Sequence, residues 1–267
     1  MSAISIFVLL FSSAVANDMK FDYQISEGRA RFTENIETNL ERNTVKYYTP
    51  AHNDVLESYK ILDFNKKMQI TCLPSLKQCR LRNIDIEELT GDAGTVAESF
   101  LHSWNKGENS IDSENSKKIN EMYYIDNEEV KNTIKLGEDL RKFYENYGRD
   151  GKGEGFPLYK EKKLPEDAVL LNITRSGVRR SKRSFAPLNN DCQGQTPVTR
   201  YGVDSGRSCN YLKICKKAAV VNERRVFADC NNVHITSPLV YVCVCCPDVT
   251  EINLNSDKCS CTKMNGP

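Results

Sequence analysis

Histidine, tryptophan and net charge are all scarce in this sequence. Its 267 residues include three histidines, one tryptophan, and 37 basic against 36 acidic side chains, for a formal net charge of +1. A charge so near zero leaves no electrostatic footprint for nucleic acid. The histidines lie far apart in the sequence, and no Ser/His/Asp or Cys/His spacing indicates nucleophilic catalysis. We therefore expect no enzyme activity, no cofactor or metal site, and no nucleic-acid partner.

Cysteine is almost absent from the first 190 residues and dense in the remainder. Only two of the 11 cysteines, Cys72 and Cys79, precede residue 190. The other nine are Cys192, Cys209, Cys215, Cys230, Cys243, Cys245, Cys246, Cys259 and Cys261. This density is typical of a disulfide-stabilised domain. In a secreted chain such cysteines are more often paired than bound to metal, so we expect all 11 to belong to a disulfide framework.

An apolar stretch opens the chain and indicates its compartment. Residues 2–16 end in Ala14-Val15-Ala16, the small-x-small pattern that signal peptidase cleaves. The stretch is short for the roughly 20 residues that span a bilayer. We predict a signal peptide over 1–16 and secretion, with a membrane anchor as the alternative. In the secretory pathway Asn172, which begins Asn-Ile-Thr, becomes a candidate glycosylation site.

Residues 20–163 show the alternation of a sheet, interrupted by two helical patterns. Apolar residues at every second position predict an antiparallel meander over 20–81. Apolar residues at helical spacing predict helices over 84–104 and 128–147. The segment 156–159 contains a proline, which cannot donate to a ladder, so it is expected to form an edge strand. We treat 20–163 as one domain.

A basic run separates the cysteine-poor part from the cysteine-rich part. Residues 164–183 are polar and end in Arg180-Ser-Lys182-Arg183, followed by Ser184. Clustered cations in an extended chain suit the acidic cleft of a proprotein convertase, which we expect to cut between Arg183 and Ser184. A solvated basic run or a heparin-type patch is the alternative. The linker is therefore 164–183, and 184–267 is the C-terminal domain.

Several segments together resemble the BRICHOS family, especially its chondromodulin and tenomodulin branch. They are 43–48 (NTVKYY), 61–71 (ILDFNKKMQIT), 77–81 (KQCRL), 119–130 (INEMYYIDNEEV) and 155–159 (GFPLY). The resemblance implies an α+β fold, with a central antiparallel or mixed sheet, a helix on each face, and a small disulfide-rich C-terminal domain after it. It also implies that Asp63 matches the family's aspartate and Cys79 its first cysteine.

The chain departs from this family at the second cysteine. The family's second cysteine would stand near Gly153, but no cysteine lies between 79 and 192. Cys72 offers a substitute, because Cys72 and Cys79 flank a turn and could face each other across a hairpin. Asp63 has two interpretations. Burial in its strand would raise its pKa, whereas an outward-facing position would leave it an ordinary surface carboxylate.

The segment 238–247 leads to a functional hypothesis. Eight consecutive uncharged residues of high β-propensity lie between Pro238 and Pro247, which makes the segment prone to pair with copies of itself. By the resemblance, the BRICHOS domain is an intramolecular chaperone for this segment, and the convertase then releases the C-terminal domain. The alternatives are an uncleaved type II membrane or matrix signalling protein and an antimicrobial peptide precursor. The receptor of the released domain is unknown.

An odd cysteine remains in the C-terminal domain if Cys72 pairs with Cys79. Nine cysteines form at most four internal disulfides, so one thiol is left over. The sequence leaves three outcomes open: a disulfide-linked homodimer, a buried inert thiol, or a disulfide from the C-terminal domain to Cys72 or Cys79.

Overall fold

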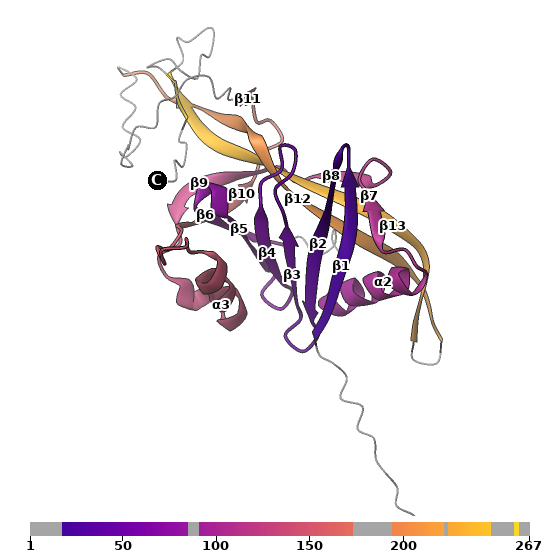
Figure 1. Ribbon diagram of the computed structural model, residues 1–267. Helices are drawn as coiled ribbons and strands as arrows, with labels where there is room; N and C mark the ends of the chain where they lie inside the picture. Colours follow the sequence, from indigo (N-terminus) through magenta and orange to yellow (C-terminus); the bar gives the residue numbers. More distant parts are fainter. Residues whose placement is uncertain (1–17, 85–90, 173–193, 222–223, 247–258, 262–267) are drawn as a thin grey trace, which may run out of the picture.

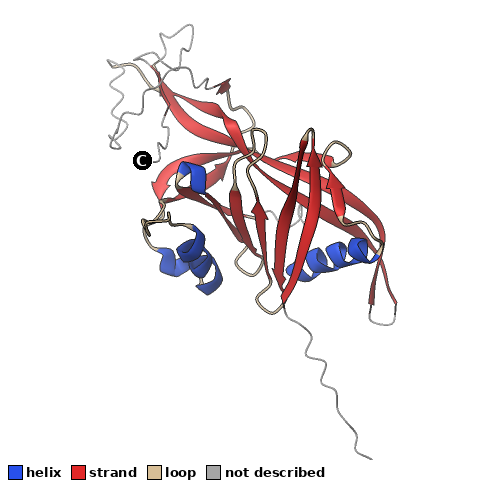
Figure 2. Ribbon diagram, in the orientation of Figure 1, coloured by secondary structure: helices blue, strands red, loops and turns tan. Residues whose placement is uncertain are grey.

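Strands dominate the protein, whose computed structural model describes residues 18–84, 91–172, 194–221, 224–246 and 259–261. They form one sheet of 14 strands in the order β11-β12-β13-β9-β10-β6-β5-β4-β3-β2-β1-β7, with β8 and β14 also pairing with β13 (Figures 1 and 2). The strands of the first half are β1 (Asp18–Glu27), β2 (Ala30–Asn39), β3 (Thr44–Thr49), β4 (Ser58–Asp63), β5 (Met68–Leu73), β6 (Gln78–Asn83), β7 (Ser110–Asp112), β8 (Lys117–Asn120), β9 (Tyr123–Glu129) and β10 (Leu158–Lys163). Those of the second half are β11 (Leu170–Asn172), β12 (Val198–Val221), β13 (Arg224–Cys245) and β14 (Cys259–Cys261).

The predicted antiparallel meander is present as β1 to β6. Each strand pairs with the next in antiparallel register. Alternating burial along β1 and β2 reflects one face packed on the core and one face toward solvent. Gly28, with φ +57°, supplies the left-handed turn residue between these two strands. The local periodicity therefore determined this part of the sheet.

Two helices pack on the meander. Helix α2 (Ala93–Asn105) begins at Asp92, whose carboxylate accepts a hydrogen bond from Thr95 N. Its buried side chains share a core with Leu62, whereas those of α3 (Glu138–Tyr147) share a core with Ile61, the preceding residue of β4. Two 3₁₀ turns, Pro74–Leu76 and Thr133–Leu136, complete the helical elements of the described residues.

The expected α+β fold is wrong, because the protein is mostly β. The two helices are short, and strands make up nearly all the remaining regular structure. The expectation of a sheet followed by a separate small domain also fails for the described residues. Strand β13 pairs in parallel with β9 and β8, so the long hairpin β12–β13 continues the same sheet (Figure 1). Long-range strand pairing leaves no periodic signal in the local sequence. The expectation of a separate C-terminal domain came instead from the resemblance to the BRICHOS family.

Three local predictions need correction. Helix α3 starts at Glu138 because β9 continues to Glu129 and a 3₁₀ turn follows. No strand was predicted just after residue 104, where the chain forms β7, which pairs in parallel with β1. The segment expected to be an edge strand leads into β10, an interior strand between β6 and β9. Pro157 precedes the ladder, so its missing N–H costs no strand hydrogen bond.

The hairpin β12–β13 shares its core with the N-terminal part. Tyr211 and Val233 belong to the same buried cluster as Phe100 of α2. Leu239 and Tyr241 pack with Ile125 in a second cluster. Because its apolar side chains are buried in these shared clusters, the hairpin is an integral part of the described fold.

Candidate functional site

The unpaired edge of β12 faces the N-terminal part of the chain. Cys215 and Cys230 are register partners whose Cα atoms lie 3.9 Å apart, a separation typical of a non-hydrogen-bonded pair. The register is continuous from Arg207 to Cys215. Main-chain N–H and C=O groups of the odd-numbered residues between them therefore point away from β13. An unpaired strand edge of this kind is a template for pairing with other chains.

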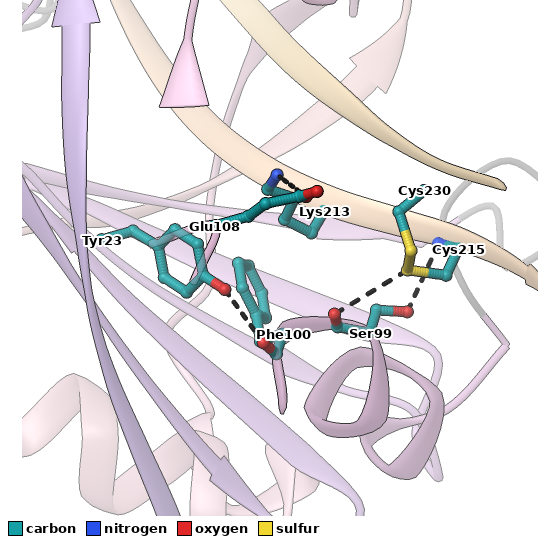
Figure 3. The surroundings of a disulfide bond; sticks show 7 residues. All are labelled: Tyr23, Ser99, Phe100, Glu108, Lys213, Cys215 and Cys230. Atoms are coloured by element: carbon teal, nitrogen blue, oxygen red, sulfur yellow. Dashed lines mark hydrogen bonds and ion pairs between the residues drawn. A yellow bond between two sulfur atoms is a disulfide. The ribbon is translucent and has the colours of Figure 1, made fainter. Parts of the chain in front are cut away.

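Main-chain groups of the N-terminal part contact one end of this edge, and helix α2 contacts the other. Arg207 N donates to Asp54 O (3.3 Å), and Leu56 N donates to Arg207 O (2.8 Å). At the far end, Cys215 N donates to Ser99 Oγ of α2 (3.4 Å), beside the Cys215–Cys230 disulfide (Figure 3).

Side chains of β2 and β3 contact the middle of the edge. Thr49 Oγ1 lies 3.2 Å from Cys209 O and 2.9 Å from Glu34 Oε1. Tyr211 N donates to the Glu34 carboxyl group, with both oxygens at 3.3 Å. Burial raises the pKa of Glu34 to about 8. These contacts, with those at Arg207 and Cys215, form a row that we call the edge cap, made by Glu34, Thr49, Asp54, Leu56 and Ser99.

A small cavity lies beside the edge cap. Its volume is about 10 Å³, room for about one water molecule. The lining residues are Tyr47, Lys60, Leu62, Gln69, Arg82, Glu121, Asn210, Leu212 and Ile235. Burial lowers the pKa of Lys60 to about 8, and both amide atoms of Asn210 are buried without a hydrogen-bond partner. The hairpin thus meets the meander through polar as well as apolar contacts.

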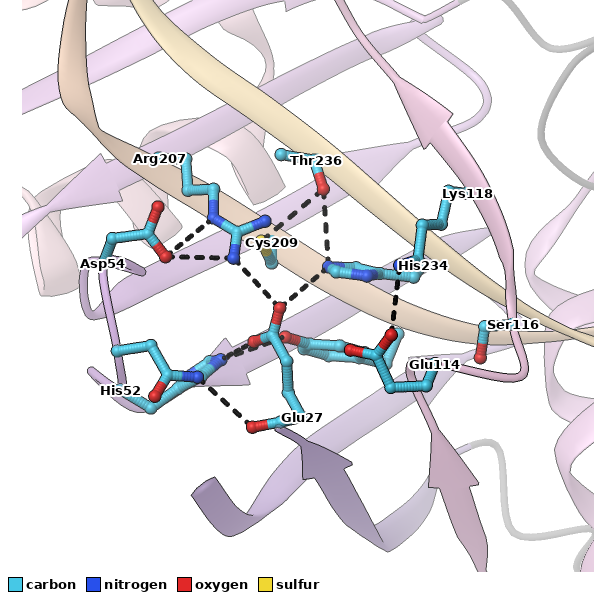
Figure 4. Close-up of polar contacts among 12 residues, drawn as sticks. Glu27, His52, Asp54, Glu114, Ser116, Lys118, Arg207, Cys209, His234 and Thr236 are labelled. Carbon is cyan, nitrogen blue, oxygen red and sulfur yellow. Dashed lines mark hydrogen bonds and ion pairs between the residues drawn. The ribbon is translucent and has the colours of Figure 1, made fainter. Parts of the chain in front are cut away.

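Glu27 is the centre of a second buried polar cluster between the two parts (Figure 4). Its carboxylate contacts Arg207 Nη2 (3.0 Å), His52 Nε2 (2.7 Å) and Tyr211 Oη (2.9 Å). Burial opposes the charged form, but hydrogen bonds and nearby cations outweigh it and lower the pKa of Glu27. His234 stacks on Tyr211 with ring centroids 4.7 Å apart, and burial lowers its pKa. Both halves of the chain therefore contribute to one hydrogen-bonded cluster.

Asp63 is buried, and the structure gives it a turn-forming contact. Its Oδ1 accepts a hydrogen bond from Lys66 N (2.9 Å) in the turn between β4 and β5. It contacts neither the edge cap nor the Glu27 cluster, so it lies outside the candidate site.

Two disulfides lie within the described residues, Cys72–Cys79 in the meander and Cys215–Cys230 in the hairpin. Cys243, Cys245 and Cys246 are also disulfide-bonded. Cys209 is a free thiol that is fully buried, and burial raises its pKa to about 11. Cys209 matches the buried inert thiol, one of the three outcomes that the odd number of cysteines leaves open. The side chains of Cys192, Cys259 and Cys261 lie outside the described residues.

The remaining predicted sites are only partly described. Asn172 is the last residue of β11. The signal peptide 1–16 and the cleavage residues Arg180, Lys182, Arg183 and Ser184 lie outside the described residues. In the segment 238–247, Val240 and Tyr241 pair with Tyr124 and Ile125 of β9.

Five residues of the site were not predicted from the sequence: Glu27, Glu34, Thr49, His52 and His234. One signal was available: Glu34 has the same strand parity as Ile36, which places it on the buried face of β2. Its contact with Tyr211 spans 177 residues and has no local signature.

A comparison with protein-family models, curated proteins and solved structures found no match to this chain. Among the described residues, no three ligating side chains are grouped to hold a metal ion. The part of the chain that the structure describes also holds no helix long and apolar enough to cross a membrane. The candidate site is therefore interpreted from its own geometry.

Proposed function

We propose that the chain is a secreted proprotein of the BRICHOS type, in which the N-terminal part is an intramolecular chaperone for the hairpin β12–β13. The edge cap is the observation that carries this proposal. Partners for main-chain groups of β12 come from β2, β3, the segment after β3, and α2. They occupy the edge without adding a strand along its length, which is how a protein blocks edge-to-edge association.

The length of the hairpin explains why such protection is needed. Strands β12 and β13 span 24 and 22 residues, several times the usual strand length. The aggregation-prone segment 238–247 lies in the same hairpin, where Leu239 and Tyr241 are buried against Ile125. We propose that the N-terminal part covers both features while the disulfides of the C-terminal part form.

Cleavage between Arg183 and Ser184 remains part of this proposal, with a changed consequence. The N-terminal part has only Cys72 and Cys79, which pair with each other, so no intramolecular disulfide joins the two parts. The shared core, however, holds them together. We therefore propose that the convertase produces a non-covalent two-chain complex, and that release of the C-terminal part requires a later step.

Self-association of full-length variants tests the chaperone role. Replacing Glu34 and Thr49 together by alanine removes the middle of the edge cap, and light scattering at neutral pH should then show oligomers. The matched control replaces Glu37 and Thr33, which lie in β2 outside the cap, and should stay monomeric. If the cap variant is folded and as monomeric as the control, edge protection is not the role of these residues.

The alternatives predict different exported material. An uncleaved type II membrane or matrix signalling protein would retain residues 1–16 and yield no chain that begins at Ser184. An antimicrobial precursor would release a C-terminal chain that acts alone. Mass spectrometry of the exported protein distinguishes the uncleaved protein from the cleaved products by the presence of a chain that begins at Ser184, and it also reports a glycan at Asn172.

A further inference from the structure

Hydrogen-bond geometry places a proton on Glu34. A threonine hydroxyl carries one proton, yet Thr49 Oγ1 is within hydrogen-bond distance of both Glu34 Oε1 (2.9 Å) and Cys209 O (3.2 Å). A protonated Glu34 satisfies both contacts, because it donates to Thr49, which in turn donates to the Cys209 carbonyl. Complete burial favours the same neutral form and raises the pKa of Glu34 to about 8.

The surroundings of His234 favour its neutral form. Its Nδ1 is buried without a hydrogen-bond partner. Its Nε2 lies 3.9 Å from Glu27 Oε1, beyond a normal hydrogen bond, and 3.4 Å from Thr236 Oγ1. Both Glu27 oxygens already contact other donors (Figure 4). A proton added to His234 would therefore be a buried charge with no carboxylate within hydrogen-bond distance.

Other titratable groups surround the two residues. Those near Glu34 are Tyr47, Lys60 and Tyr211. Those near His234 are Glu27, His52, Lys118, Arg207, Cys209 and Tyr211. The cations near His234 oppose its protonation, and the anion Glu27 favours it. None of these groups is changed by the variants described below.

We propose that Glu34 and His234 are a compensating pair that keeps docking of the hairpin nearly constant between about pH 5 and 6.5. As pH falls through this range, the unfolded chain gains a proton on His234 that the docked chain excludes, which weakens docking. Over the same range the docked chain keeps a proton on Glu34 that the unfolded chain lacks, which strengthens docking. The two effects have opposite signs, and neither can exceed about tenfold in the equilibrium constant per pH unit.

This inference concerns the interface of the proposed function but needs neither cleavage nor a chaperone role. It can be tested on four full-length proteins: wild type, Glu34→Gln, His234→Phe and the double variant. Glutamine reproduces the donor and acceptor of the neutral acid, and phenylalanine preserves the ring stack on Tyr211 without a titrating nitrogen. Urea unfolding at about pH 5 and about pH 6.5 gives the unfolding equilibrium constant of each protein.

Relative to wild type, the unfolding constant of Glu34→Gln should rise as pH falls, and that of His234→Phe should fall. Neither change should exceed about tenfold per pH unit, and the double variant should follow the wild-type pH dependence. Glu37→Gln is the control, because Glu37 lies on the opposite face of the same strand with its side chain 37% exposed, and it should show no such trend. Single variants whose ratios to wild type do not change with pH, or change in the same direction, would overturn the proposal.

A second measurement covers the case in which His234→Phe does not fold. The ring protons of His234 in wild-type protein, followed by NMR, should titrate at a pH below the ordinary value of histidine. A ring that titrates near pH 6.5, the ordinary value of histidine, would overturn the compensating pair. That result would leave the edge cap, and with it the proposed function, intact.

Discussion

Thr49 and Glu34 form hydrogen bonds with the main chain of β12. Their partners are the carbonyl of Cys209, a group that every residue carries, and the N–H of Tyr211, which every residue except proline carries. Buried main-chain groups must find hydrogen-bond partners. These two side chains provide such partners in the middle of the β12 edge. The identity of the β12 side chains matters less at these two points than the extended conformation of the strand.

Thr49→Val should destabilise the protein by about 1–2 kcal/mol, because valine has nearly the same shape but leaves the buried Cys209 carbonyl without a donor. Urea unfolding at pH 7 measures the loss. Thr33→Val is the matched control on β2, at a hydroxyl that accepts an exposed hydrogen bond from Gln24, and it should change stability by less than about 0.5 kcal/mol. Equal effects of the two substitutions would contradict the role of Thr49.

Asn210→Leu should stabilise the protein. Both amide atoms of Asn210 are buried and lack protein partners, so an apolar side chain of similar size removes an unfavourable burial. We expect a gain of about 1 kcal/mol in the free energy of unfolding. A loss instead would mean that the amide is satisfied in solution through water in the adjoining cavity.

At the scale of elements, each described disulfide closes a loop within one strand pair. The Cys215–Cys230 loop spans 15 residues and the Cys72–Cys79 loop spans 7. Chain entropy then predicts that replacing both cysteines by alanine costs about 3 kcal/mol for the first pair and about 2 kcal/mol for the second. Urea unfolding of the two double variants checks this order. A larger loss from the shorter loop would show that native-state packing outweighs chain entropy.

Local pattern explains what could be predicted from the sequence and what could not. The meander follows from alternation and turns a few residues long, and Cys72–Cys79 lies across one such turn. The hairpin β12–β13 was missed because its role depends on pairs such as Thr49 with Cys209, 160 residues apart. The helices were placed from periodicity, but the fold class came from a resemblance and overstated their share.

The whole molecule combines two parts that are separable in sequence but share one core. We expect the chain cut between Arg183 and Ser184 to remain a single species in size-exclusion chromatography at pH 7, because the hairpin keeps its buried contacts. On a denaturing gel without reductant, it should run as two fragments, since Cys72 and Cys79 pair with each other. Separate species under native conditions would contradict the shared core, and a single denatured band would contradict the disulfide assignment.

Amide hydrogen exchange along β12 tests the edge cap most directly. Even-numbered amides between Arg207 and Cys215 face β13 and should exchange slowly in any account of the hairpin. The edge cap predicts that the odd-numbered amides of Arg207, Tyr211 and Cys215, which donate to Asp54, Glu34 and Ser99, are also slow. A strict alternation of slow and fast amides along this stretch would show that the edge is open to solvent and would contradict the account.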